Sequence, residues 1–163
     1  MASPAGYSRT QIILHWLVAI MIAAQFVFHD AISAAWHAFV SSAAVPFNPL
    51  VAAHVFGGIA IGAFMLWRFV LRFRRGVPAL PQEETPALKW LAHAVHWAFY
   101  AVVLLLVVSG GAAWFGGVGA AASAHGVLKT LLLALVGLHV GGAFVHWLVL
   151  KTDVLMRMFK PAT

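Results

Sequence analysis

Residues 131–150 read LLLALVGLHVGGAFVHWLVL, and they carry no Asp, Glu, Lys or Arg. The run has the length of about 20 residues that an apolar helix needs to cross the hydrocarbon core of a bilayer. Two histidines, His139 and His146, interrupt it. An ionisable side chain inside a membrane span is costly and normally has a partner within the protein, so we expect these histidines to belong to a functional site whose other groups lie on other segments.

The composition of the whole chain agrees with a membrane protein. Of its 163 residues 63% are hydrophobic and 9% are charged, and the mean hydropathy is +0.95. Soluble domains are about 45–50% apolar and about 25% charged, so an ordinary soluble domain is excluded. The absence of cysteine excludes a thiolate-bound iron–sulfur cluster, a Cys-based zinc site and a disulfide framework. Nine histidines remain as the strong metal ligands.

Apolar runs predict four membrane-spanning helices, at about residues 9–29, 49–73, 88–109 and 125–151. Ser8 and Gln11 have the spacing of a capping box that begins the first helix. Residues 77–86, VPALPQEETP, form a polar, proline-rich linker between the second and third helices. We therefore expect an all-α fold, in which residues 1–163 form a single four-helix transmembrane domain.

The basic residues predict the orientation of these helices. Nine of the ten Lys and Arg residues lie before the first helix, around the linker or after the fourth helix. The positive-inside rule places this side, and both termini, in the cytoplasm. The formal charge of +6 therefore reflects orientation and not nucleic-acid binding. The loops at 29–49 and 109–124 then face outside and contain no Lys or Arg, which leaves Lys129 as the cation near that surface.

Histidine spacing predicts two sites at different depths. His125 and His139 are 14 residues apart, so their side chains project within about 40° of each other and differ in depth by about 21 Å. His54 lies at the depth of His125. At the cytoplasmic end, His15 can meet either His139 or His146, although the latter choice would separate the two sites by about 31 Å, a poor spacing for electron exchange. Two stacked bis-histidine sites follow from this spacing.

A bis-imidazole site in a helix bundle is typical of low-spin haem b, which needs flat walls. Small residues flank both candidate sites: Gly57, Gly58 and Gly62 follow His54, and Gly137, Gly141 and Gly142 surround His139. Such residues also serve helix packing in membranes. Because Gly58 and Gly141 lie beside candidate ligands, we expect them to pack against haem.

Several segments carry a resemblance to a known family. They are YSRTQIILHW (7–16), LWRFVLRF (66–73), LAHAVH (91–96) and HGVLKTLLLALVGLH (125–139), followed by His146 and KTDVLMRMF (151–159). In this order, and over nearly the whole chain, they resemble the bacterial cytochrome b561 family. The resemblance implies a four-helix protein of the bacterial inner membrane that holds two haem b groups.

The same resemblance implies roles for individual residues. His15 and His139 would bind the inner haem, and His54 and His125 the outer one. His146 would lie near a ubiquinone site and exchange protons with the quinone. The family includes an enzyme that oxidises superoxide outside the membrane and passes the electrons to ubiquinone. Superoxide is an anion that positive charge would attract. The scarcity of cations in the outer loops therefore argues against superoxide as the substrate.

Other histidines and arginines have two interpretations each. His93 and His96 are either helix histidines near the inner interface or partners of haem propionates or quinone. Arg68 and Arg72 anchor the topology, and their guanidinium groups are also candidate partners for the propionates of an inner haem. His29 and His37 are expected to be solvated residues of the first outer loop.

Three functions are consistent with the sequence. The first is an oxidoreductase that passes electrons between a small-molecule or protein donor and ubiquinone through two haems. The second is a membrane anchor and electron-transfer subunit for a separate redox partner. The third is a histidine-lined transporter of protons or a divalent metal, against which the spans carry no acidic residue and no broken-helix signal.

Overall fold

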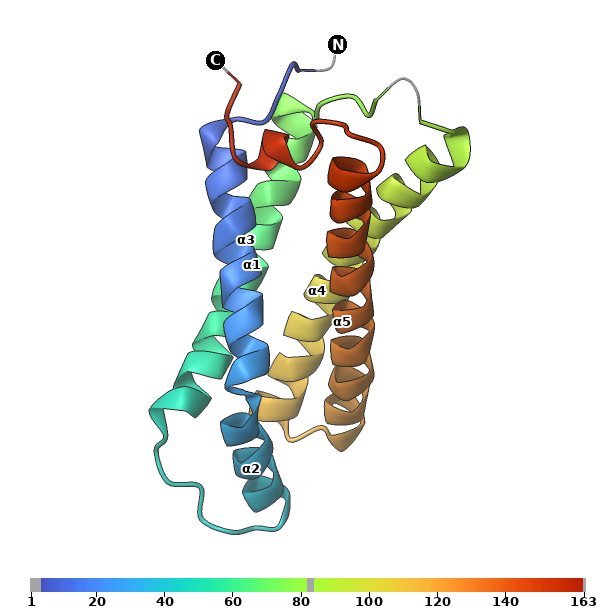
Figure 1. The fold of residues 1–163 in the computed structure, drawn as a ribbon. Coiled ribbons are helices and arrows are strands. Elements are labelled where there is room, and N and C mark those ends of the chain that lie inside the picture. Colours follow the sequence, from blue (N-terminus) through green and yellow to red (C-terminus); the bar gives the residue numbers. More distant parts are fainter. Residues whose placement is uncertain (1–3, 82–83, 163) are drawn as a thin grey trace.

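The computed structural model describes residues 4–81 and 84–162. Over these residues the chain is helical and contains no strand: its helices are α1 (Arg9–Val27), α2 (His29–Val40), α3 (Pro49–Arg75), α4 (Pro86–Gly116) and α5 (Gly119–Leu148), and a 3-10 turn follows at Met156–Met158 (Figure 1). Four of these helices, α1, α3, α4 and α5, are long and apolar enough to cross a membrane. The prediction of an all-α fold with four transmembrane helices is confirmed.

Three of the four long helices begin where the sequence provides capping side chains, whereas α5 begins after Val118 without one. Ser8 caps α1, because its hydroxyl accepts a hydrogen bond from the Gln11 backbone while the Gln11 side chain accepts one from the Ser8 backbone at 2.9 Å. Asn48 and Thr85 cap α3 and α4 in the same sense, and each is followed by a proline at the first helical position. The predicted capping box is therefore present.

The first outer connection differs from the predicted loop at 29–49, because residues His29–Val40 form helix α2. This helix packs against α3 and, less extensively, against α1. Its sequence, HDAISAAWHAFV, is amphipathic, with Ala35 buried on the side that faces the bundle. At 12 residues α2 is too short to span a bilayer. A helix of this length is marginally stable alone, so α2 depends on packing of its apolar face against the bundle.

The second outer connection is much shorter than the predicted loop at 109–124. Helix α4 continues to Gly116 and α5 begins at Gly119, so only two residues separate them. Gly117 makes this tight turn possible, since its φ of 67° lies in the left-handed region that glycine adopts easily. The Gly and Ala residues around the turn resemble a loop in composition, yet they are compatible with closely packed membrane helices. The resulting α4–α5 hairpin has the most extensive helix contact in the bundle.

Packing in the bundle is uneven. α1 packs on α3, α3 on α4, and α4 on α5, whereas α5 makes little backbone contact with α1 or α3. One cluster of buried side chains fills the middle of the bundle: Val18, Ile61, Met65, Val102, Val103 and Leu132. On the outer side of this cluster a cavity lies between α5 and the helices opposite.

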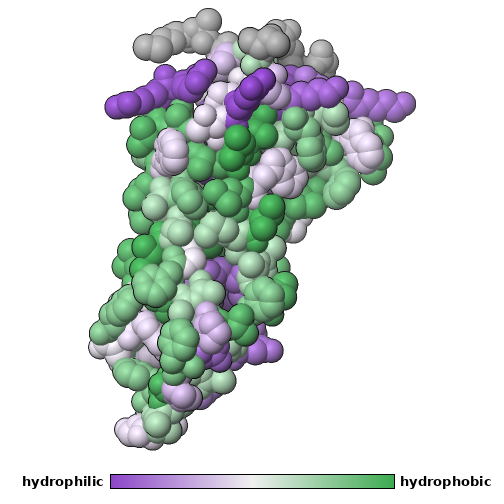
Figure 2. All heavy atoms as spheres, turned by 90° about the vertical axis from the view of Figure 1, so that its left-hand side faces the viewer, coloured by the Kyte–Doolittle hydropathy of each residue, from purple (hydrophilic) through white to green (hydrophobic). Residues whose placement is uncertain are grey.

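Both described ends of the chain lie at the same end of the molecule, which we name the inner end; the end that carries α2 is the outer end (Figure 1). The C-terminal tail folds back over the inner end. Trp16 Nε1 donates to the Met158 carbonyl at 2.8 Å, and the Ala162 backbone donates to the Tyr7 carbonyl at 3.0 Å. Figure 2 shows strongly hydrophilic side chains gathered at this end above a largely apolar surface.

Candidate functional site

At the outer end, α3 and α5 bring two histidine rings together. The ring centres of His54 and His125 lie 6.4 Å apart and their planes are inclined by 62°. His125 Nδ1 lies 3.0 Å from the Leu106 carbonyl on α4 and 3.3 Å from Ser109 Oγ. A proton on Nδ1 that is donated to a carbonyl leaves Nε2 with a free lone pair, which is the tautomer that a metal-bound histidine needs.

At the inner end, α1 and α5 form a second pair. The ring centres of His15 and His139 lie 6.1 Å apart, with the same inclination of 62°. Two rings of α4 contact His139 edge to face, His96 at 5.3 Å and Phe99 at 5.4 Å. His96 in turn bonds to its own helix, with Nδ1 2.6 Å from the Ala92 carbonyl. These contacts orient the His139 ring toward His15.

Both separations fit a group held between two imidazoles. A metal–imidazole bond is about 2 Å long and the ring centre lies about 1 Å beyond the ligating nitrogen, so two rings on opposite sides of one metal have centres about 6 Å apart. Each pair also joins two helices whose backbones barely touch. Among the described residues no group of three or more His, Asp or Glu could hold a metal ion.

The outer pair faces a cavity of about 310 Å³ whose lining includes Gln25, His29, His54, Gly58, His125 and Lys129. A side chain at Gly58 would meet no atom within 4 Å, so this glycine borders open space. His54 Nδ1 and Gln25 Oε1 are buried without a hydrogen-bond partner. A cavity with unsatisfied polar atoms is a site that a polar, planar ligand could fill.

Arg68 lies near the inner pair with unsatisfied donors. Its Nε and Nη1 atoms are buried and have no hydrogen-bond partner within the described part of the chain, and it interacts with the hydroxyl groups of Tyr7 and Tyr100. Burial raises the pKa of Tyr7 although Arg72 and Arg68 act in the opposite direction, so that phenol does not neutralise the guanidinium. Buried guanidinium donors normally bind a carboxylate, and haem carries two propionates. Arg72, in contrast, lies 5.4 Å over the Trp97 ring.

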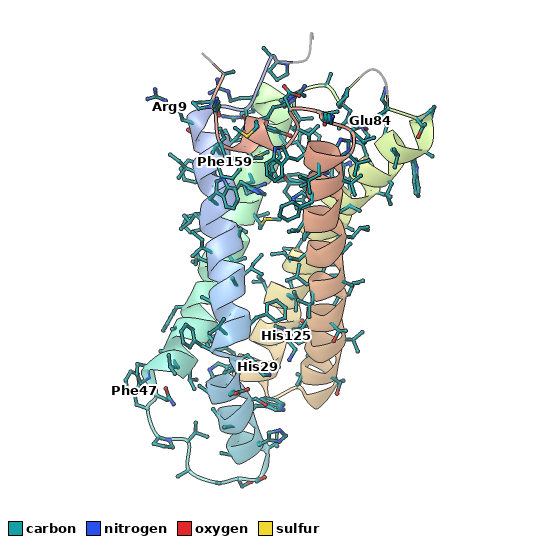
Figure 3. The ribbon with its side chains drawn as sticks, in the orientation of Figure 1. Arg9, His29, Phe47, Glu84, His125 and Phe159 are labelled. Carbon is teal, nitrogen blue, oxygen red and sulfur yellow. The ribbon has the colours of Figure 1, made fainter. Side chains whose placement is uncertain are left out.

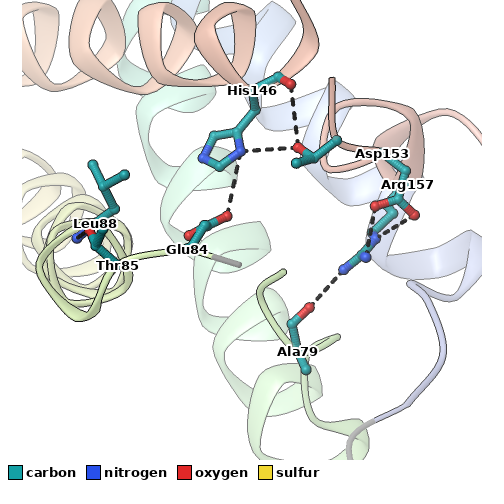
Figure 4. A network of polar contacts seen from close by, with 8 residues as sticks. Ala79, Glu84, Thr85, Leu88, His146, Asp153 and Arg157 are labelled. Carbon is teal, nitrogen blue, oxygen red and sulfur yellow. Dashed lines mark hydrogen bonds and ion pairs between the residues drawn. The ribbon is translucent and has the colours of Figure 1, made fainter. Parts of the chain in front are cut away.

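His146 belongs to a different cluster at the inner end. Its Nδ1 lies 3.1 Å from Thr152 Oγ1 and 3.5 Å from Glu84 Oε1 (Figure 4). The ring also lines an open groove between α4 and α5, together with Leu88, Gly141, Val145 and Leu150. Gly141 therefore borders this groove, on a different side of α5 from the His139 ring.

The structure adds Glu84, which the sequence did not single out. It lies in the linker before α4, where its neighbours Gln82, Glu83 and Thr85 indicate a solvated segment, yet its side chain is only 3% exposed. The chain has only four acidic residues, and this rarity is the one signal that pointed to Glu84.

The remaining histidines are placed as follows. His29 and His125 both lie toward the outer end, and Glu84 lies toward the inner end (Figure 3). His29 lines the outer cavity and its Nδ1 lies 3.0 Å from Asp30 Oδ1. His37 is exposed on α2, and His93 is exposed on α4. His29 is thus a helix residue beside the cavity and not the solvated loop residue that was expected.

Comparison with known proteins gives the family. The family model described as prokaryotic cytochrome b561 matches residues 6–161. The chain is 32% identical to cytochrome b562 of Cereibacter sphaeroides, with 99% of each chain covered, and 27% identical to the probable superoxide oxidase CybB of Yersinia pestis, with 93% of this chain and 94% of that protein covered. Together with its four long apolar helices, these matches show that the chain belongs to the prokaryotic cytochrome b561 family, that is, to the bacterial multi-pass membrane cytochromes that bind haem b and transfer electrons.

Proposed function

We propose that this protein passes electrons across the bacterial inner membrane, from a donor on the outer side to ubiquinone, through two haem b groups held at different depths. The proposal rests on one observation: two histidine pairs lie at different depths, with ring centres 6.4 Å apart in the outer pair and 6.1 Å apart in the inner pair. Haem supplies a redox centre that accepts and releases one electron at a time. The two sites are about 21 Å apart along α5, from the rise between His125 and His139.

In this proposal the chain's own residues hold and orient the haems. His54 and His125 hold the outer haem, with Leu106 and Ser109 setting the tautomer of His125. His15 and His139 hold the inner haem, and Arg68 binds a propionate with its buried, unpaired donors. The residues in between, chiefly the buried cluster around Ile61 and Val103, exclude water from the path.

The proposed donor side carries a cation at the cavity. Lys129 lines the cavity that contains His54 and His125. A fixed positive charge at this position would attract an anionic donor such as superoxide, and the relative from Yersinia pestis is named a probable superoxide oxidase. We therefore include superoxide as the candidate substrate and place this end outside the cytoplasm, in keeping with the nine cations at or near the opposite end.

A haem count tests the proposal. The purified protein should show the spectrum of reduced haem b after dithionite and about two haems per chain in a pyridine haemochrome assay. His146→Ala should keep both haems and slow electron exchange with ubiquinone, because His146 lies outside both ring pairs. Folded protein without haem would contradict the proposal and favour the histidine-lined transporter, and loss of a haem in His146→Ala would contradict the assignment of ligands.

A further inference from the structure

Glu84 is a buried carboxylate that has no hydrogen-bond partner among residues 4–81 and 84–162. Its side chain is 3% exposed, and both carboxylate oxygens are unsatisfied. The nearest cationic partner is His146, whose Nδ1 lies 3.5 Å from Oε1, a distance that allows an ion pair but is long for a hydrogen bond. Burying a carboxylate in this way costs free energy unless a nearby group compensates for its charge.

Thr152 fixes the tautomer of the His146 ring. The Thr152 hydroxyl donates to the His146 carbonyl at 3.4 Å, so its oxygen is free to accept a hydrogen bond from Nδ1–H at 3.1 Å. The Nδ1 side of the ring thus faces Thr152 and Glu84. The other ring nitrogen, Nε2, lies on the edge of the ring away from these two contacts (Figure 4). His146 and Leu88 line the same groove, so a ligand in this groove lies beside the ring.

The groove beside His146 fits the headgroup of a lipid-soluble carrier. Its volume is about 570 Å³, and its other lining residues are apolar or glycine, including Leu88, Val145 and Leu150. A side chain at Gly137 or Gly141 would meet no atom within 4 Å, so the glycines widen the groove along α5. An apolar site with a single imidazole suits a quinone, whose carbonyl oxygens accept hydrogen bonds and whose hydroquinone donates them.

Resting on the proposed function, we propose that Glu84 is the positioning residue for His146 in proton exchange with a quinone bound in this groove. Reduction of a quinone consumes two electrons, which the outer donor supplies, and two protons. For each proton, the Nε2–H bond of protonated His146 breaks and an O–H bond of the hydroquinone forms. Before the transfer the Glu84 carboxylate balances the charge of the imidazolium, and afterwards the neutral ring regains a proton from water at the inner end.

The test uses the full-length protein with its haems. Oxidised wild type, Glu84→Gln and Glu84→Asp are mixed without oxygen with a short-chain ubiquinol, and haem reduction is followed by absorbance. Glutamine keeps the size of the side chain but cannot balance the charge, so the maximal rate should fall about 10- to 100-fold. The KM for ubiquinol should stay within about twofold, because the groove is unchanged. Aspartate should restore part of the rate.

Controls separate this inference from the proposed function. Asp30→Asn removes an exposed carboxylate on α2, at the opposite end of the molecule from His146, so it should keep the wild-type rate. If Glu84→Gln fails to fold with its haems, Thr152→Val takes its place and should also lower the rate. A wild-type maximal rate in haem-loaded Glu84→Gln would overturn the role of Glu84 alone. A wild type that dithionite reduces but ubiquinol does not would overturn the quinone site itself.

Discussion

At the scale of single residues, tautomers and unpaired atoms distinguish the histidines from one another. His125 donates from Nδ1 to α4 and keeps Nε2 free, whereas His146 is held by Thr152 and faces Glu84. The first arrangement suits a metal ligand, and the second suits an acid or base. His125 and His146 lie on one helix but have different chemistry, because their Nδ1 atoms have different partners.

The outer pair gives the first prediction. His54→Ala or His125→Ala should lower the haem content from about two to about one per chain, because in the proposed function both histidines would hold the outer haem. The measurement is a pyridine haemochrome assay on the purified variants. His37→Ala, an exposed histidine of α2 at the same end, is the matched control and should keep both haems. Two haems in His54→Ala would show that this ring is not a ligand.

Arg68 gives the second prediction. If its buried donors bind a propionate, Arg68→Gln removes a positive charge beside the inner haem and makes the oxidised form more stable. The midpoint potential of that haem should fall by some tens of millivolts, where about 59 mV is a tenfold change for one electron. Redox titration followed by visible spectroscopy measures it. Arg75→Gln, an exposed arginine at the end of the same helix, should leave both potentials unchanged.

At the scale of elements, the helices differ in what holds them. α3 and α4 meet closely at Gly62, where an added Cβ would lie 3.1 Å from Val107 Cγ2. α5 contributes one residue, Leu132, to the buried core and packs mainly against α4. The contact at Gly62 therefore fixes the distance between two helices, while the face of α5 that carries His125 and His139 stays open to a cofactor.

Gly62 gives the third prediction. Gly62→Val should force α3 and α4 apart, and overpacking of this kind costs about 1–3 kcal/mol. The variant should lose its haem absorbance at a lower temperature than wild type when heated in detergent. Gly119→Val is the matched control, because a side chain there meets no atom within 4 Å and Gly119 lies at the start of α5. Equal melting temperatures for the two variants would show that the close approach of α3 and α4 does not limit stability.

At the scale of the whole molecule, charge and the tail organise the inner end. Arg157 donates to Asp153 at 2.7–3.0 Å and to the Ala79 carbonyl at 2.7 Å, so the tail after α5 is tied to the linker before α4. The hydrogen bond from Arg157 also lowers the pKa of Asp153, so this carboxylate is charged at neutral pH. The tail and linker together place Thr152 and Glu84 against the Nδ1 side of the His146 ring.

Orientation gives the fourth prediction. The chain contains no cysteine, so single cysteines can be introduced without a background. Ala44→Cys, in the exposed segment between α2 and α3, should react with a membrane-impermeant maleimide in intact spheroplasts. Arg75→Cys, exposed at the inner end, should react only after the membrane is opened. The reverse pattern would place the termini outside and contradict the positive-inside prediction.

The sequence by itself determined what depends on neighbours along the chain. Hydropathy identified the four spans, the Ser8–Gln11 spacing predicted the start of α1, and the 14-residue step from His125 to His139 placed two side chains on one helix face at two depths. These features follow from the pitch of a helix and the length of a membrane span, and both depend only on residues that are close in the sequence. The helix α2 and the two-residue turn before α5 were missed because Gly, Ala and scattered polar residues are equally common in loops.

Only the tertiary structure decided which groups meet. Whether His139 or His146 faces His15 depends on the rotation of α5 relative to α1, and the packed bundle brings His15 to His139. Glu84 reaches His146 because the linker and the tail fold over the same end, although 62 residues separate them in the chain. Such contacts depend on helix packing, where small changes in crossing angle move a side chain to another neighbour, and no local pattern encodes that angle.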